Sequence, residues 1–112
     1  MFVQLPMHRY KADPDWKHWC LIREAQMRTF KSVKNTGIAV ILDCGEFNEI
    51  HPKNKVPVGH RLYLQAMHHV YGDRETEAFG PIYKNMTVTG DRAVISFDHA
   101  ESGFDIKGDN GK

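Results

Sequence analysis

A histidine with acidic neighbours follows directly after the most apolar run of this 112-residue chain. The apolar run covers residues 37–42, and His51 lies in the loop that follows, together with Glu46 and Glu49. A carboxylate beside a histidine fixes its tautomer and stabilises its protonated form, which makes the histidine a candidate general base. Residues 44–56 are therefore the candidate catalytic loop.

Other reactive groups have weaker support in the sequence. The seven histidines include no pair four apart and no HExxH pattern, so no metal site is predicted. None of the three serines, Ser32, Ser96 and Ser102, lies in the G-x-S-x-G or Gly-Asp-Ser turn that exposes a nucleophile. Cys44 could pair with His51 as an alternative nucleophile, but a short side chain at a strand end is expected to pack.

The elements that must position this loop alternate as strand, helix, strand and helix. Residues 2–5 are predicted to form a short strand, and an Asp-Pro-Asp start predicts a helix over residues 13–33. The nearly continuous apolar character of residues 38–43 is typical of a parallel strand covered on both faces. Residues 57–71 are predicted to form the second helix, so the first three elements make a βαβ unit.

Each predicted helix carries a stripe of side chains at helical spacing. The first stripe is Trp19, Ile22, Phe30 and Val33, with Gln26 as its polar member, and the second is Val58, Leu62, Ala66 and Val70. Arg23 and Gln26 face roughly the same side of the first helix. They are either solvated, in an ion pair with a neighbouring acid, or they brace the active-site loop.

Composition sets broad limits on function. Net charge is +1 with 41% hydrophobic and 26% charged residues, which gives no reason to expect a nucleic-acid or anionic-membrane partner. No apolar run approaches the ~20 residues of a membrane span. Cys20 and Cys44 could form one disulfide, but a buried thiol is expected for Cys20 inside the helix. Neither cysteine fixes the compartment, so the localisation stays open.

The chain changes character near residue 79. Residues 86–89 and 92–97, joined by a Gly-Asp turn, predict a β-hairpin. Residues 105–112 are polar, as in a frayed end. Two parts are therefore expected, residues 1–78 and residues 79–112.

Taken together, several segments resemble the C-terminal part of a sialate O-acetylesterase, a carbohydrate-acetyl esterase of the SGNH-hydrolase superfamily. They are FVQL, W-x-x-W-x-L-I-R-E-A-Q, GIAVILDCGEFNEIHPKNKVPVGHRLYLQA, YG and FGPIYK, and the most specific stretch is IHPKNK-x-x-x-G-x-R-L. The resemblance implies an α/β fold, with residues 1–78 as the C-terminal portion of a flavodoxin-like three-layer SGNH-hydrolase domain. Residues 79–112 would then be a truncated β-rich extension.

The resemblance also implies roles for residues. The histidine of the family's IHP motif falls on His51. In the wider superfamily the acid lies three residues before the histidine, where this chain has Asn48, and in this family an Asp often lies two before, where it has Glu49. Glu49 is therefore the first choice for the acid. Glu46 and Asp43 follow, and a Ser–His dyad remains open.

The family's Gly-Asp-Ser block and oxyanion donors precede the matched region. The chain also begins at once in a predicted strand, so we expect a fragment or one component of a split serine esterase, inactive alone. The expected partners are the N-terminal half that bears the serine and an acetylated carbohydrate substrate, with no cofactor. The alternative is a non-catalytic carbohydrate- or protein-binding fragment.

Overall fold

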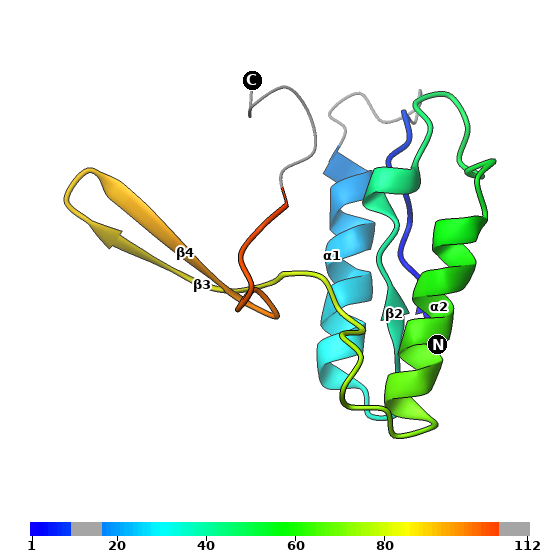
Figure 1. Ribbon diagram of the computed structural model, residues 1–112. Coiled ribbons are helices and arrows are strands. Elements are labelled where there is room, and N and C mark those ends of the chain that lie inside the picture. The colour runs from blue at the N-terminus through cyan, green and yellow to red at the C-terminus, as the bar shows by residue number, and fades with distance from the viewer. Residues whose placement is uncertain (10–16, 106–112) are drawn as a thin grey trace. The chain divides into compact units, whose positions relative to one another are not determined.

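The polypeptide divides into two units, Met1–Ala78 and Phe79–Lys112, and the computed structural model describes residues 1–9 and 17–105 of them. The elements of the first unit are β1 (Phe2–Val3), α1 (Lys17–Ser32), β2 (Ile38–Ala39), the 3-10 helix η1 (Leu42–Cys44) and α2 (Val56–His69) (Figure 1). The fold is mixed α/β, as predicted. The predicted Asp-Pro-Asp helix start lies outside the described residues.

The strands β1 and β2 pair in parallel, with Phe2 opposite Ile38. The amides of Phe2 and Gln4 donate to the carbonyls of Gly37 and Ala39, each at 2.9 Å. Because α1 joins two parallel strands, the predicted βαβ order is confirmed. In Figure 1, α1 and α2 flank the strand pair, and both helices run opposite to the strands.

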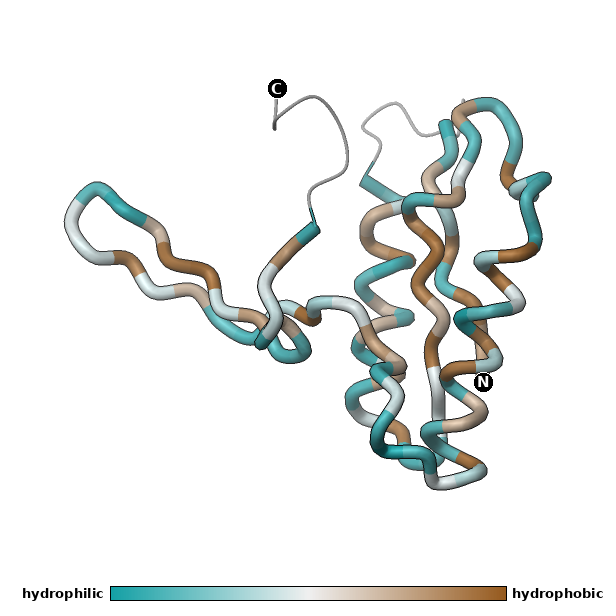
Figure 2. The backbone as a smooth tube through the Cα atoms, in the orientation of Figure 1, coloured by the Kyte–Doolittle hydropathy of each residue, from teal (hydrophilic) through white to brown (hydrophobic). Residues whose placement is uncertain are grey.

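The second strand is shorter than predicted. It ends at Ala39, and the chain then turns into η1 instead of staying extended through residue 43. Ile38, Ala39 and Ile41 are buried, whereas Val40 and Leu42 are 40% and 47% exposed. The prediction that the whole run is covered on both faces is therefore wrong. Figure 2 shows this apolar run between the two helices.

A glutamine side chain caps each outer edge of the strand pair. Alternate residues of a strand present their amides to opposite edges. The amide of Leu5 therefore points away from β2, and the amide of Ile38 points away from β1. Gln26 Oε1 accepts from the Leu5 amide at 3.0 Å and Gln26 Nε2 donates to the Val3 carbonyl at 3.5 Å. Gln65 Oε1 accepts from the Ile38 amide at 3.1 Å. Gln26 thus takes both hydrogen-bonding roles of a neighbouring strand.

This contact corrects the expectation for Arg23 and Gln26. Gln26 braces strand β1, not the loop. The Arg23 guanidinium donates to Cys20 Sγ at 3.3 Å and pairs with no acid among residues 1–9 and 17–105. The Arg23 carbonyl accepts from Gln4 Nε2 at 3.0 Å, which adds a second tie between α1 and β1.

The predicted stripe on α1 is only partly correct. Trp19 and Phe30 are half-buried, but Ile22 and Val33 are exposed, and Val33 lies beyond the helix end. Cys20 is also exposed, so the expected burial of its thiol is wrong. The physical reason is that the inner face of α1 meets the edge of β1, where polar side chains satisfy backbone groups.

Helix α2 begins one residue before the predicted start and ends two residues before the predicted end. Val58, Leu62 and Ala66 of its predicted stripe are half-buried, whereas Val70 lies past the helix and is exposed. Gln65, which was not in the stripe, is the buried residue of this helix at 1% exposure. None of the helices in the described part of the chain is long and apolar enough to cross a membrane.

The second unit contains the predicted hairpin, with β3 (Ile82–Thr89) antiparallel to β4 (Arg92–Asp98). Gly90 occupies the turn with φ of 62°, a conformation that favours glycine. Register and alternation place one set of apolar side chains on a single face: Tyr83, Met86, Val88, Ala93, Ile95 and Phe97. These side chains are all exposed within the described residues.

Candidate active site

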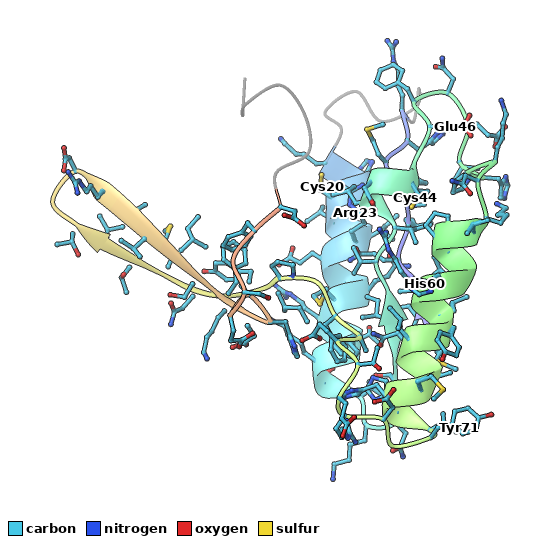
Figure 3. The ribbon with its side chains drawn as sticks, in the orientation of Figure 1. Cys20, Arg23, Cys44, Glu46, His60 and Tyr71 are labelled. Carbon is cyan, nitrogen blue, oxygen red and sulfur yellow. The ribbon has the colours of Figure 1, made fainter. Side chains whose placement is uncertain are left out.

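The loop that carries His51 leaves the carboxyl end of β2 and ends at the start of α2. In parallel α/β sheets this end of the strands is where ligands and reactive groups gather. Figure 3 shows Cys44 and Glu46 at this end of the unit, whereas Tyr71 lies at the far end of α2. The loop is therefore placed where a catalytic group is useful.

His51 is held by the carboxylate of Glu49. Glu49 Oε1 accepts a hydrogen bond from the His51 amide at 3.0 Å and lies 3.3 Å from Nδ1 of the His51 ring. The His51 backbone hydrogen bond, and then its side chain, lower the pKa of Glu49. The carboxylate faces Nδ1, and the His51 side chain is 82% exposed, so Nε2 is left open to a reacting group.

Glu46 serves the shape of the loop and is not paired with His51. Its Oε1 accepts from the Lys53 amide at 2.9 Å, and its carbonyl accepts from the Glu49 amide at 3.3 Å. Just beyond, Asn54 Oδ1 accepts from the Val56 amide at 3.2 Å, where α2 begins. These bonds fold the loop into a closed turn around His51.

Asp43 is engaged by a residue that the sequence interpretation did not single out. Arg61 of α2 grips both carboxylate oxygens of Asp43, at 2.5 and 2.7 Å. The hydrogen bond from Arg61 is the main cause that lowers the pKa of Asp43 to about 2. Asp43 is thus a permanent anion paired to Arg61. The signal that could have found Arg61 is its place in the G-x-R-L end of the motif.

Cys44 is poorly suited to act as a nucleophile. Burial is the main cause that raises the pKa of its thiol, so the reactive thiolate is disfavoured. Its Sγ lies 3.5 Å from Arg61 Nη1, and no contact with His51 is present within residues 1–9 and 17–105. Cys20 and Cys44 are both free, so the disulfide that the sequence left open is not formed.

The N-terminal segment contacts the start of the loop through its backbone at Met7 and Arg9. A Cβ added at Gly45 would come within 2.3 Å of the Met7 carbonyl oxygen, so only glycine fits this close approach of two backbones. The Arg9 amide also donates to the Phe47 carbonyl at 2.8 Å. Neither contact was predicted, because each joins segments almost forty residues apart and neither has a local sequence signature.

His8 is a second histidine beside this loop. Its ring lies 5.5 Å from that of Trp19, centroid to centroid, and its charge contributes slightly to the lowered pKa of Glu49. Its Nδ1 is buried without a hydrogen-bond partner in the described part of the chain. Among the same residues no group of three or more His, Cys, Asp or Glu side chains could hold a metal ion.

Comparisons with known proteins point to one class of enzyme. No known family profile matches the chain. The crystal structure of a carbohydrate acetylesterase from Xanthomonas citri matches with a TM-score of 0.79 and 40% identity, over 87% of this chain and 22% of that one. The chain is thus similar in structure to one part of that carbohydrate acetylesterase.

A curated relative narrows this class. Mouse sialate O-acetylesterase is 29% identical over 107 residues, which cover 88% of this chain and 20% of that protein. The chain is sialate O-acetylesterase-like, and it spans about one fifth of the length of these relatives.

Proposed function

We propose that this chain supplies the general base of a carbohydrate-acetyl ester hydrolase of the sialate O-acetylesterase type. In this proposal residues 1–78 are the C-terminal portion of a flavodoxin-like SGNH domain. The serine nucleophile and oxyanion donors belong to the N-terminal half. The observation that carries the proposal is the contact of Glu49 Oε1 with both the amide and Nδ1 of His51.

The proposed mechanism follows from this contact. Glu49 holds the proton on Nδ1 of His51, so Nε2 is free to accept the proton of the serine hydroxyl as it attacks the acetyl carbonyl. The tetrahedral intermediate then expels the sugar oxygen, which takes the proton back from Nε2. A water molecule next attacks the acetyl-enzyme, with His51 again accepting a proton, and acetate leaves as the serine is regenerated.

The assignment of the acid to Glu49 is supported by the partners of its rivals. Both oxygens of Asp43 are bound by Arg61, and Glu46 Oε1 is bound by the Lys53 amide. Among the described residues, Glu49 is the acid within hydrogen-bonding distance of the His51 ring. The remaining possibility is a Ser–His dyad, in which kcat would not depend on the Glu49 carboxylate.

The test uses the complete enzyme, meaning this chain together with the N-terminal half that bears the serine. His51→Ala should lower kcat by about three orders of magnitude or more on an acetylated sugar. His60→Ala, which removes an exposed histidine of α2, is the matched control and should leave kcat unchanged. Retention of more than about a tenth of wild-type kcat in His51→Ala would remove His51 from the mechanism.

Glu49 is tested separately. Glu49→Gln should lower kcat by about a hundredfold or more, because an amide no longer enforces the Nδ1–H tautomer or stabilises the imidazolium. KM should change little, since the carboxylate faces the histidine and not the sugar. An unchanged kcat would favour the Ser–His dyad.

The rival proposal, a non-catalytic binding fragment, makes an opposite prediction. If it is correct, the complete protein should bind acetylated carbohydrate or a protein without releasing acetate.

The 112-residue chain alone should show no turnover of an aryl acetate above the buffer rate, because it contains no activated serine. Saturable hydrolysis that Cys44→Ala abolishes would instead assign the chemistry to that thiol.

A further inference from the structure

Arg61 bonds to both sides of the turn that leads into the His51 loop. Its Nη1 donates to the carbonyl of Val40 at 2.8 Å, just before η1, and to the Asp43 carboxylate inside η1 at 2.5 Å. Its Nη2 donates to the second Asp43 oxygen at 2.7 Å. One guanidinium therefore holds the point where the chain stops being a strand and the point where the loop starts.

We propose that Arg61 is a positioning residue for His51, because it fixes the direction in which the catalytic loop leaves β2. This inference rests on the proposed function, in which His51 is the general base. Arg61 contacts neither substrate nor reacting atoms in this proposal. It acts through the Asp43 carboxylate and the backbone of the turn.

The connectivity explains how the effect reaches His51. Asp43 comes directly before the loop, and Arg61 lies on the helix that directly follows it. The ion pair therefore closes residues 43–61 into a ring that contains the whole loop. Inside this ring, the bond from the Lys53 amide to Glu46 sets the smaller turn that carries His51.

The geometry distinguishes this pair from an ordinary surface ion pair. The side chains of Arg61 and Asp43 are 32% and 50% exposed, and pairs this exposed usually add little stability. A planar guanidinium with two parallel bonds to a carboxylate and a third to a carbonyl nevertheless allows only one orientation. The expected contribution is to the position of the loop more than to the free energy of unfolding.

A lysine at residue 61 would not reproduce this arrangement. Its ammonium is a single point with no fork, so it can approach Asp43 or the Val40 carbonyl but has no fixed bidentate geometry. The pKa of Asp43, near 2, also means that the pair stays charged at every pH at which such an enzyme would be assayed. Its role is thus fixed geometry and not a pH-sensitive switch.

The test compares Arg61→Lys, Arg61→Met and Asp43→Asn in the complete enzyme. Each should lower kcat by about 10- to 100-fold, the loss expected from a small misplacement of a catalytic group, with KM nearly unchanged. Arg28→Met is the matched control, because it breaks an exposed 2.7 Å pair with Glu24 on α1 that has no link to the loop. Its kcat should equal that of the wild type.

Three further measurements separate positioning from general destabilisation. The double variant Arg61→Met/Asp43→Asn should be no slower than the slower single variant, because the two residues act as one unit. Millimolar methylguanidinium should restore part of kcat to Arg61→Ala and have no effect on Arg28→Ala. Circular dichroism at the assay temperature should show the same folded fraction for every variant.

Several results would overturn the inference. They are an unchanged kcat in all three single variants, a change confined to KM, or a kcat loss that follows the folded fraction. Should the Arg61 variants not fold, Asp43→Asn alone decides, since it keeps the shape of the side chain, removes the charge and replaces one acceptor oxygen with an amide donor. Failure of the proposed function would look different, because His51→Ala would then keep its activity whatever Arg61 does.

Discussion

The carboxylate of Glu46 accepts a hydrogen bond from the backbone amide of Lys53, 2.9 Å away, and closes the loop that carries His51. The Lys53 ammonium also lies 3.6 Å from the other Glu46 oxygen, but this contact is solvent-exposed. Of the two, the bond to the amide is the one that shapes the backbone.

Substitution of these two residues should separate the two contacts. Glu46→Ala should lower kcat of the complete enzyme by about tenfold, because the loop loses its closing bond and His51 samples unproductive positions. Lys53→Met keeps the amide and removes only the exposed ion pair, so its kcat should stay near that of the wild type. Amide hydrogen exchange at Lys53 should accelerate in Glu46→Ala only. Equal losses in both variants would contradict this view.

Gln65 should be one of the side chains on which stability depends most. It is 1% exposed. Its side-chain Oε1 accepts from the Ile38 backbone amide at 3.1 Å, and its Nε2 donates to the Ala78 carbonyl at 2.7 Å. Gln65→Met keeps the size of the side chain but leaves the Ile38 amide and the Ala78 carbonyl without these hydrogen-bond partners. This should lower the free energy of unfolding by about 2–4 kcal/mol. Urea unfolding measures this, with Glu24→Gln on the exposed side of α1 as control. A loss below about 0.5 kcal/mol would contradict the assignment.

Stability of the first unit should fall as pH drops through about 6.5. Burial, and then the positive charges of His68, Arg74 and the N-terminus, lower the pKa of His69 from its ordinary value of 6.5. In this pH range His69 therefore binds a proton more readily in the unfolded chain than in the folded chain, so the free energy of unfolding decreases with falling pH. Below the folded-state pKa the decrease should level off.

Urea unfolding at pH 8 and pH 5.5 measures this dependence. His69→Gln should reduce the difference in free energy between the two pH values, because the substituted side chain does not titrate. His60→Gln, at an exposed position of α2, should leave the difference as it is. The same slope in wild type and His69→Gln would show that another group is responsible.

The isolated chain should self-associate or bind a hydrophobic dye through one face of its hairpin. A two-stranded hairpin is marginal in water, and an exposed apolar face and free strand edges promote association. Met86 and Ile95 lie opposite each other on this face, and Thr87 and Val94 on the other. A monodisperse monomer without dye binding would contradict the prediction.

Paired substitutions on the two faces locate the effect. Met86→Lys/Ile95→Lys should reduce dye binding and association, because charges interrupt the apolar face. Thr87→Lys/Val94→Lys adds the same charges at the neighbouring pair and should reduce them less. Analytical ultracentrifugation of both variants at one concentration distinguishes the faces.

The order of elements could be predicted from the sequence because its signals are local. The four-residue spacing of Val58, Leu62 and Ala66, close to one helical turn, predicted α2 to within two residues at each end. The Gly90 turn between two β-rich stretches predicted the hairpin, which is longer than expected by four residues at the start and one at the end. Alternating strand and helix patterns predicted the parallel pair.

The interactions that shape the candidate site could not be predicted because they join distant residues. Arg61 bonds to the carbonyl of Val40, twenty-one positions away, directly after the end of the strand that hydrophobicity alone extended to residue 43. Gln65 is a polar residue next to an apolar stripe, and only the structure shows that it satisfies a strand edge. Arg61 and Gln65 lie four positions apart and so share one face of α2, but this spacing does not identify the distant partner of either side chain.

The contact between Gly45 and Met7 has a consequence for how this protein can be cut and rejoined. A truncation that begins at α1 would keep every residue of the His51 loop and remove the backbone on which Gly45 rests. The smallest segment that could be transferred with the His51 loop in this conformation therefore includes residues 1–9, although none of these residues lies near His51 in the sequence. A graft of this loop onto another scaffold would need to supply an extended segment at the same distance, with glycine kept at position 45.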